Sequence, residues 1–285
     1  MTERWAVISD IHANIDAFEA VLRDMDEQRI DRLVVLGDTV NYGGAPRECI
    51  ELVISVADSL IFGNHEAAVL SLGKSDPGMV GAAEAGLEWT ARTLNQSLLW
   101  NKLSEGATFP NAAIALRDGV QLVHGSPREP VAEYVWPGHP SYFLAFNDQL
   151  DQRLRQMLDA RMALHCFCGH THVPAILLPY DQRAVLKGRG WDRLFSFIGP
   201  TTVFFVPNQP MVIDGLRDVP VIINPGSVGQ PRDGRPEASY MIYDGDSVEF
   251  RRVPYDVEAA QHRILALPIP RDARLYLAQR LARGE

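Results

Sequence analysis

Short apolar runs alternate with amphipathic segments along the first part of the chain. Residues 5–8, 33–36 and 59–62 are largely apolar runs, which are typical of strands buried on both faces of a sheet. Apolar residues at helical spacing occupy residues 14–27 and the segment that begins near Pro46. This strand–helix–strand order, with its short connections, predicts parallel strands joined by right-handed crossovers. We therefore expect the chain to begin as an α/β fold.

The alternation stops near residue 67, and the pattern then changes. Leucines and tryptophans between about 67 and 105 predict helices that cap one edge of the sheet. Residues 141–160 have the amphipathic pattern of a helix, whereas residues 183–197 show no clear period. The tail from about 256 to 285 is expected to be helical, with a break at residues 268–270. Further strands are predicted at 109–116, 120–123, 166–168, 175–178, 202–206, 211–213, 219–223, 238–243 and 248–253.

Side chains able to bind a metal ion directly follow five of the apolar runs. In open α/β sheets, ligands bind outside the carboxyl ends of the strands, so these side chains are expected to face a site and not the core. Because both halves of the chain supply residues to the same cluster, we expect the halves to form two sheets of one sandwich, each flanked by helices. The residues concerned are Asp10, His12, Asp38, Asn64, His65, His124, His170 and His172.

Each of these residues also has an ordinary structural interpretation. Asp38 after a strand is commonly a turn former or a helix cap, and Asn64 is equally well placed as a helix N-cap. His124 can be a core histidine, and Gly169-His170-Thr171-His172 can be a plain turn. The recurrence of one layout at five strand ends favours a shared metal site.

The types and spacing of these side chains indicate which ions they would bind. In Asp10-Ile11-His12 the two outer side chains lie on the same side of an extended chain. Carboxylate oxygens combined with imidazole nitrogens suit Mn²⁺, Fe, Zn²⁺ or Ni²⁺. The two oxygens of Asp38 can bridge two ions roughly 3.5–4 Å apart, the separation used in two-metal hydrolysis. With the neutral carbonyl oxygen of Asn64, the set is large enough for two divalent metal ions.

Composition and net charge limit the possible binding partners of the protein and its cellular compartment. The chain has 285 residues, 46% of them hydrophobic and 22% charged, which is ordinary for a globular protein. Its net charge of −9 provides no basic surface for nucleic acid, although bound metal ions would still allow a small phosphorylated substrate. No apolar stretch approaches the ~18 residues of a membrane span. Three cysteines, with Cys166 and Cys168 expected in the core, favour a soluble protein of the reducing cytoplasm over a disulfide framework.

Taken together, these motifs resemble those of the calcineurin-like metallophosphoesterase superfamily. Residues 224–232 and 250–256 resemble its small prokaryotic phosphodiesterase-like branch and extend the match almost to the end of the chain. The resemblance implies a single domain over 1–285, built as a four-layer α/β/β/α sandwich of two mixed sheets with a small helical cap. The motifs that carry it are Asp10-x-His12, Gly37-Asp38 with Gly43, Gly63-Asn64-His65-Glu66, His124 and Gly169-His170-Thr171-His172.

The resemblance also implies roles for individual residues. One ion would be held by Asp10, His12, Asp38 and His172, and the other by Asp38, Asn64, His124 and His170. A hydroxide between the ions would attack phosphorus, and His65 would protonate the leaving oxygen. Glu66 would either orient His65 or favour the helix N-terminus electrostatically. The candidate substrate contacts are Tyr42, Ser227 and Arg232.

Departures from the superfamily pattern bear on the substrate. Superfamily members that act on phosphoproteins carry phosphate-binding arginines where this chain has Asn41-Tyr42-Gly43 and Phe62. A diester tolerates that absence better than a monoester dianion, so a phosphodiesterase is expected unless Arg128 or Arg232 supplies the contact. A phosphomonoesterase and a dinucleoside polyphosphate hydrolase are the alternatives on the same site. A non-catalytic scaffold is a further alternative, against which the presence of His65 argues.

Overall fold

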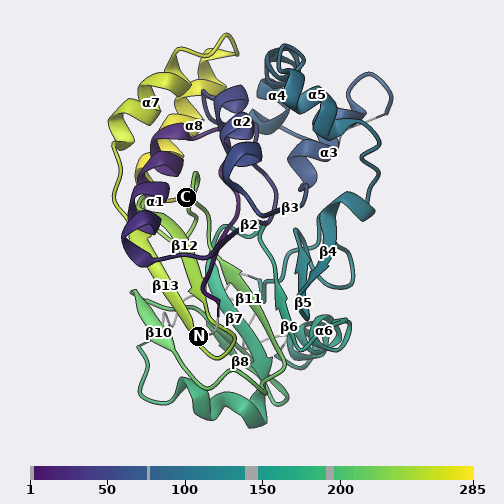
Figure 1. Cartoon of the computed structure of the whole chain (residues 1–285), viewed down its shortest axis with the longest axis vertical. Coiled ribbons are helices and arrows are strands. Elements are labelled where there is room, and N and C mark those ends of the chain that lie inside the picture. The colour runs from purple at the N-terminus through teal and green to yellow at the C-terminus, as the bar shows by residue number, and fades with distance from the viewer. Residues whose placement is uncertain (1–2, 76–77, 139–146, 191–195, 209) are drawn as a thin grey trace.

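Two β-sheets packed face to face form the centre of the molecule (Figure 1). The computed structural model describes residues 3–75, 78–138, 147–190, 196–208 and 210–285. The strand order of the first sheet is β10 (Met211–Ile213), β13 (Val248–Val253), β12 (Ala238–Tyr243), β1 (Trp5–Ile8), β2 (Arg32–Val35) and β3 (Ser59–Leu60). The order of the second is β4 (Ile114–Arg117), β5 (Val120–Val123), β6 (His165–Phe167), β11 (Val221–Pro225), β7 (Pro174–Pro179), β9 (Thr202–Phe205) and β8 (Phe197–Ile198).

The strands that precede the predicted metal ligands run parallel within each sheet. β2 lies between β1 and β3, with Trp5 opposite Arg32 and Val34 opposite Ser59. In the second sheet, β6 lies parallel to both β5 and β11. The carboxyl ends of each parallel group therefore meet at one edge of their sheet. The parallel start predicted from the apolar pattern is confirmed.

Alternate residues of each strand face the two sides of its sheet, as the period of a strand requires. Val7 and Val34 of the first sheet pack against the second sheet in a core that includes Leu122 and Phe167. Ile8, next to Val7, points the other way and packs with the outer helices. Each central strand is thus buried on both faces, which explains why its sequence is continuously apolar.

Helices cover the outer faces of both sheets, which confirms the four-layer α/β/β/α sandwich. Helices α1 and α2 share an apolar core with β1, β2 and β12, whereas α6 packs on the second sheet. Two helices of the C-terminal tail, α7 and α8, pack on each other, and α7 also contacts α1. These helices are α1 (Ile15–Gln28), α2 (Pro46–Val56), α6 (Asn147–Asp159), α7 (Val257–Leu265) and α8 (Arg271–Arg283).

A group of helices follows β3 and forms the predicted cap (Figure 1). It consists of α3 (Asn64–Ser71), α4 (Ala82–Leu94) and α5 (Leu98–Ser104). The cap has its own apolar core around Trp100, whose ring stacks on Phe62 with the ring centroids 5.8 Å apart. Helix α8 contacts α4, so the end of the chain meets the cap.

Strand boundaries differ from the predicted ones where prolines intervene. The strand predicted at 109–116 begins only at Ile114, because Pro110 lacks an N–H and residues 111–113 form the 3₁₀ helix η1 (Asn111–Ala113). The strand predicted at 219–223 lies two residues further on. It starts after Pro220 and continues to Pro225, which pairs with Pro174 of β7.

In the described part of the segment without a clear period, residues 183–190 and 196–197, regular structure occurs only at the two ends. The 3₁₀ helix η3 (Tyr180–Leu186) overlaps its start, and β8 follows at its end. The helix predicted at 141–160 is present as α6, while residues 141–146 and 191–195 lie outside the described residues. Among the residues that the structure describes, no helix has the length and apolarity needed to cross a membrane.

The three cysteines are buried and unpaired, as expected for core residues. Burial raises the pKa of the Cys166 and Cys168 thiols, which therefore stay protonated at neutral pH. Within the described part of the chain, neither thiol joins a cluster of potential metal ligands. The metal-competent groups are instead the carboxylates and imidazoles at the strand ends.

Candidate metal centre

Loops from the strand ends of both sheets are joined by hydrogen bonds. The N–H of Asp10, after β1, donates to Gly37 O after β2 at 3.1 Å, and His12 N–H donates to Asp38 O at 2.9 Å. From the second sheet, His170 N–H donates to both carboxylate oxygens of Asp10, at 3.2 and 3.0 Å. These bonds bring residues 160 positions apart in sequence into one site.

Several residues of these loops adopt the left-handed backbone region, which side-chain-bearing residues rarely enter. Each such residue costs of order 1–3 kcal/mol unless the surroundings hold it, and such strain concentrates at functional sites. The sharp turns occur at the points where the strand ends must redirect side chains toward one another. The residues and their φ angles are Asp10 (54°), His12 (48°), Asp38 (51°), His170 (68°) and His172 (60°).

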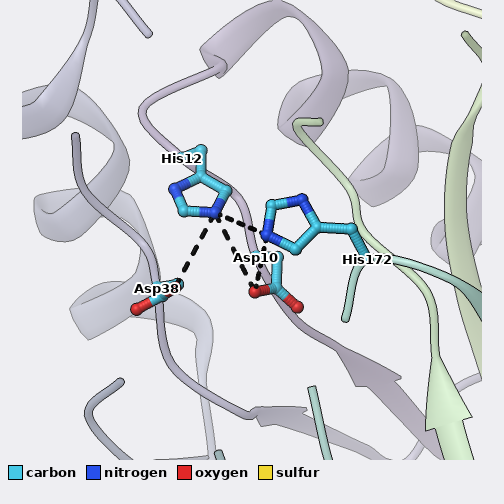
Figure 2. Close-up of side chains that lie close together, drawn as sticks. All are labelled: Asp10, His12, Asp38 and His172. Atoms are coloured by element: carbon cyan, nitrogen blue, oxygen red, sulfur yellow. Dashed lines mark hydrogen bonds and ion pairs between the residues drawn. The ribbon is translucent and has the colours of Figure 1, made fainter. Parts of the chain in front are cut away.

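One buried group consists of Asp10, His12, Asp38 and His172, whose potential ligand atoms all lie within 4.8 Å of one another (Figure 2). His12 Nε2 and His172 Nε2 are only 3.0 Å apart. The Nδ1–H groups of these two rings donate to backbone carbonyls, of Val40 at 3.2 Å and Gln230 at 2.6 Å. Both Nε2 atoms therefore carry lone pairs that face each other, an arrangement that a cation between them stabilises.

A second buried group consists of Asp38, His124 and His170. His124 Nε2 lies 3.2 Å from Asp38 Oδ2 and 3.1 Å from Asn64 Oδ1, so Asn64 belongs to the same group. His124 Nδ1 and His170 Nε2 donate to the carbonyls of Leu36 at 2.7 Å and Ala132 at 2.9 Å, which leaves the other nitrogen of each ring available to bind a metal ion. Asp38 is shared by both groups.

The close approach of two strand-end loops explains the glycine before Asn64. A Cβ added to Gly63 would lie 2.2 Å from Asp38 Oδ1 and 2.7 Å from Cε1 of His124. Any larger residue would therefore displace a carboxylate or an imidazole of the site. The glycine of the Gly-Asn-His-Glu motif is required by space around the shared carboxylate.

Burial has the largest effect on the protonation of the site. It lowers the pKa of His12 and His172 well below the usual range and raises that of Asp10 to about 7. For His124, burial acts to lower the pKa, but the charge and hydrogen bond of Asp38, the charge of Asp10 and the hydrogen bond to the Leu36 carbonyl together outweigh it and raise the pKa to about 9. For Asp38, burial acts to raise the pKa, but the charge of His124 helps hold it well below the usual range.

These protonation states fit a metal ion. Without one, a proton on His124 satisfies the oxygens of Asp38 and Asn64 that converge on it. A divalent ion would replace that proton and would also separate the facing lone pairs of His12 and His172. The chemistry of the donor set, two carboxylates, one amide oxygen and four imidazoles, is that of ions such as Mn²⁺, Fe, Zn²⁺ or Ni²⁺.

His65 lies next to the ligand groups without belonging to either. Its backbone N–H donates to Asp38 Oδ1 at 2.9 Å, and its ring lies 4.7 Å from that of His12. Asn41 Nδ2 donates to His65 Nδ1 at 3.0 Å and to Ala83 O at 3.0 Å. The neutral ring therefore carries its proton on Nε2, and burial lowers the pKa of His65 to about 4.

The sequence pattern did not reveal the role of Asn41. From the sequence it was only part of the segment Asn41-Tyr42-Gly43, which lacks the phosphate-binding arginine of superfamily members that act on phosphoproteins. In the structure, Asn41 is fully buried and holds the ring of His65. No local signal identifies this contact, because Asn41 and His65 come from loops after different strands. Phe62, the other departure, packs in the core of the cap against Trp100.

Glu66 joins the two strand-end loops from beneath the site. Its carboxylate accepts the N–H groups of Gly63 at 2.7 Å, Asp38 at 2.9 Å, Thr39 at 2.7 Å and Val40 at 3.3 Å. The bond from Gly63 is the expected interaction with the start of α3, whereas the other three hold the loop that carries Asp38. No bond from this carboxylate to His65 is found within the described residues.

We expect Glu66→Ala to destabilise the protein by roughly 3–5 kcal/mol, because it leaves several buried N–H groups without acceptors. Equilibrium unfolding in urea measures this difference. The control is Glu48→Ala, which removes an exposed carboxylate from the first turn of α2 and should change the free energy of unfolding by about 0.5 kcal/mol at most. Equal stabilities of the two variants would contradict the role assigned to Glu66.

The three candidate substrate contacts differ in their surroundings. Tyr42 is half-buried, and its ring lies 4.7 Å from the rings of His12 and His65. Ser227 is fully buried; its hydroxyl donates to Asp10 O at 2.7 Å and accepts from Gln230 N–H at 2.8 Å. Ser227 therefore supports the loop of Asp10, and the structure does not place its hydroxyl toward a substrate.

Arg232 adjoins the ligand groups. Its backbone N–H donates to His172 O at 3.2 Å, and its side chain donates to Gln230 Oε1 at 3.0 Å. The Nε of Arg232 is buried and has no hydrogen-bond partner. Arg128, the other arginine considered from the sequence, is instead paired with Glu133. Of these two arginines, Arg232 is the one with an unused donor beside the site.

Comparisons with known proteins identify the family. The family model of the calcineurin-like phosphoesterase superfamily domain matches residues 4–247. Uncharacterized protein MJ0912 of Methanocaldococcus jannaschii is 29% identical over 295 residues, which cover 98% of this chain and 97% of the relative. The crystal structure of a metallophosphoesterase from Sphaerobacter thermophilus is 33% identical, covers 100% of both chains and has a TM-score of 0.74. Hypothetical protein PH1004 from Pyrococcus horikoshii OT3, with 18% identity, coverage of 96% and 97% and a TM-score of 0.61, shares the fold.

The matched region contains both groups of clustered side chains, from Asp10 to His172. Buried carboxylates and imidazoles with converging lone pairs agree with the metal-dependent chemistry of the family. Since the family model spans most of the chain and the S. thermophilus protein matches it from end to end, this chain belongs to the calcineurin-like phosphoesterase superfamily.

Proposed function

We propose that this protein, a metal-dependent phosphoesterase by family, hydrolyses phosphodiesters at a centre of two divalent metal ions. The observation that carries the proposal is the sharing of Asp38 between two buried ligand groups. A carboxylate common to two groups is the usual bridge of a two-metal hydrolase. The first ion would be held by Asp10, His12, Asp38 and His172, and the second by Asp38, Asn64, His124 and His170.

The protein residues position these ligands and the substrate. When bound, the ions supply Lewis acidity to the phosphoryl oxygens and activate water for attack on phosphorus. The backbone carbonyls of Val40, Gln230 and Leu36 fix the ring orientation of His12, His172 and His124. This outer shell of acceptors keeps the ligand nitrogens directed at the centre and raises their basicity.

His65 would act on the leaving group. Because Nδ2 of Asn41 donates to Nδ1 of His65, Nδ1 holds the lone pair of the neutral ring, and the Nε2–H is available to donate a hydrogen bond to the departing oxygen. Its position beside Asp38, with Nε2 3.9 Å from Oδ2, places this donor at the edge of the ligand groups. A positioned donor of this kind typically contributes 10²–10⁴-fold to the rate.

Diesters are expected to be better substrates than matched monoesters. The amide of Asn41 is hydrogen-bonded to His65 and the ring of Phe62 packs in the cap, so neither can bind the extra charged oxygen of a monoester dianion. Arg232, beside the ligand groups, would be left to bind it. Loss of one charged hydrogen bond corresponds to about 10-fold in kcat/KM. We therefore expect bis-p-nitrophenyl phosphate to exceed p-nitrophenyl phosphate by about that factor.

The test combines elemental analysis with a substrate panel. Protein loaded with Mn²⁺ should contain two ions per chain, and the panel should include cyclic nucleotides, dinucleoside polyphosphates and a phosphopeptide with the two nitrophenyl esters. Faster turnover of the monoester or the phosphopeptide than of any diester would overturn the diester assignment. One ion per chain in a fully active protein would overturn the two-metal assignment.

A further inference from the structure

A cleft between the cap and the C-terminal helix opens next to the ligand groups. It has a volume of about 510 Å³ and is lined on one side by residues 80–83 at the start of α4. On the other side are Asp272, Tyr276 and Arg280, which follow one another at four-residue spacing along one face of α8. Tyr42 lines the same cleft and also contacts the rings of His12 and His65. One wall of the cleft is therefore also a wall of the metal centre.

Arg280 contributes a positive charge to this cleft without a carboxylate to neutralise it. Within the described residues, its guanidinium forms no ion pair, and its neighbours are the phenol rings of Tyr276, 5.4 Å from the guanidinium carbon, and Tyr42. Arg280 is half-buried. Burial lowers the pKa of Arg280, and the nearby charge of Arg232 lowers it further. A half-buried guanidinium on the wall of a cleft, with no carboxylate paired to it in the described part of the chain, is a suitable partner for an anion.

Of the two arginines, Arg232 is the nearer to the ligand groups. Arg232 is bonded through its backbone to His172, and its charge also lowers the pKa of His12 and His65. Arg280 lies farther out, beside Tyr42 in the cleft. A reacting phosphate at the ligand groups would therefore contact Arg232 and not Arg280. Arg280 would then be available to a different part of the same molecule.

We propose that Arg280 binds a second anionic group of the substrate, of the phosphate class, in the cleft between α4 and α8. The proposal rests on the phosphoesterase function proposed above and specifies the substrate further. The substrate would be a phosphate ester whose organic part carries another phosphate, and Tyr276 would offer a ring surface to the atoms between the two groups. Asp272 lies two helical turns from Arg280, at the opposite end of the cleft, where it would not oppose the anion.

A pair of chromogenic diesters tests this assignment. Thymidine 5′-(p-nitrophenyl phosphate) and its 3′-phosphorylated counterpart share the reacting group and the leaving group, and they differ only in the second phosphate. The Mn²⁺-loaded full chain should show a higher kcat/KM for the 3′-phosphorylated ester. In Arg280→Ala the ratio of the two kcat/KM values should fall about 10-fold, mostly through KM. Arg280→Lys keeps the positive charge but loses the paired N–H donors of the guanidinium, so its ratio should lie between those of the wild type and Arg280→Ala.

Arg283→Ala is the matched control. Arg283 stands in the same last turn of α8, where both arginines interact favourably with the helix C-terminus, but it pairs with Glu285 and does not line the cleft. The wild-type ratio should persist in Arg283→Ala. An unchanged ratio in Arg280→Ala, or an equal fall in both alanine variants, would overturn the proposal. Thermal unfolding of each variant shows whether α8 remains docked.

Calorimetry separates failure of this proposal from failure of the esterase function. Thymidine 3′,5′-bisphosphate should bind the wild-type chain about 10-fold more tightly than thymidine 5′-phosphate, and Arg280→Ala should remove that preference. If neither ester is hydrolysed but the Arg280-dependent preference is present, the esterase function fails and the anion site stands. If esters are hydrolysed but the wild-type chain binds both nucleotides equally, the anion site is overturned.

Discussion

Asp38→Asn is expected to lose both metal ions and to lower the rate of diester hydrolysis by roughly 10³-fold or more. Asp38 is the carboxylate common to the two ligand groups. An amide at this place removes the negative charge that both groups share and replaces one of the two carboxylate oxygens with an NH₂ group that cannot bind a metal ion. Elemental analysis and steady-state kinetics on the same preparation measure the two losses together. His124→Ala, which removes a ligand from one group only, should also lose metal and activity.

The fold of Asp38→Asn should survive, because the asparagine Oδ1 can still accept the N–H of His65 and the sandwich core lies outside the site. Far-UV circular dichroism checks this. Asp26→Asn is the matched control, since it removes an exposed carboxylate from α1 and should keep wild-type metal content and rate. A folded Asp38→Asn protein with full metal occupancy and full rate would exclude the two-metal centre.

His65→Ala is expected to keep both metal ions yet to lose roughly 10²–10⁴-fold in rate on alkyl or nucleoside esters. The loss should be smaller on nitrophenyl esters, because a nitrophenolate departs without help from a proton donor. The comparison of kcat on the two ester types, with metal content determined for each preparation, measures this difference. His65→Gln, which offers an N–H donor of similar reach, should recover part of the rate.

Asn41 provides a second test of the same assignment. In Asn41→Ala the ring of His65 loses the donor that keeps its proton on Nε2, so the variant should show the same dependence on leaving group as His65→Ala, with a smaller loss. Asn41→Ala combined with His65→Ala should add nothing to the loss in the single His65 variant. Equal losses on both ester types, together with missing metal, would instead make His65 a structural support of the ligands.

Local sequence patterns were sufficient for much of the architecture. Runs such as Val34-Val35-Leu36 predict buried strands because a strand covered on both faces needs apolar residues at every position. The placement of Asp10, Asp38 and His124 directly after such runs predicts a common site, since parallel strands end at the same edge. The predicted strand boundaries were less accurate where a proline such as Pro110 or Pro220 removes a backbone N–H donor.

Contacts between distant loops were decided only by the tertiary structure. The sequence indicates that His12 and His172 are metal-competent, but the 3.0 Å approach of their Nε2 atoms depends on carbonyls supplied by other loops. Asn41 holds His65, and Glu66 holds the loop of Asp38, through bonds that no periodicity reveals.

By itself, the sequence determined the order of strands and helices and the chemical types of the side chains at the strand ends, because both depend on local periodicity and residue chemistry. Tyr42 and Arg280 are more than 230 positions apart in the sequence, and they line the same cleft only because α8 docks against α4. Docking of this kind follows from the packing of whole elements. The metal chemistry was therefore predictable from the sequence, whereas the surroundings that select a substrate were not.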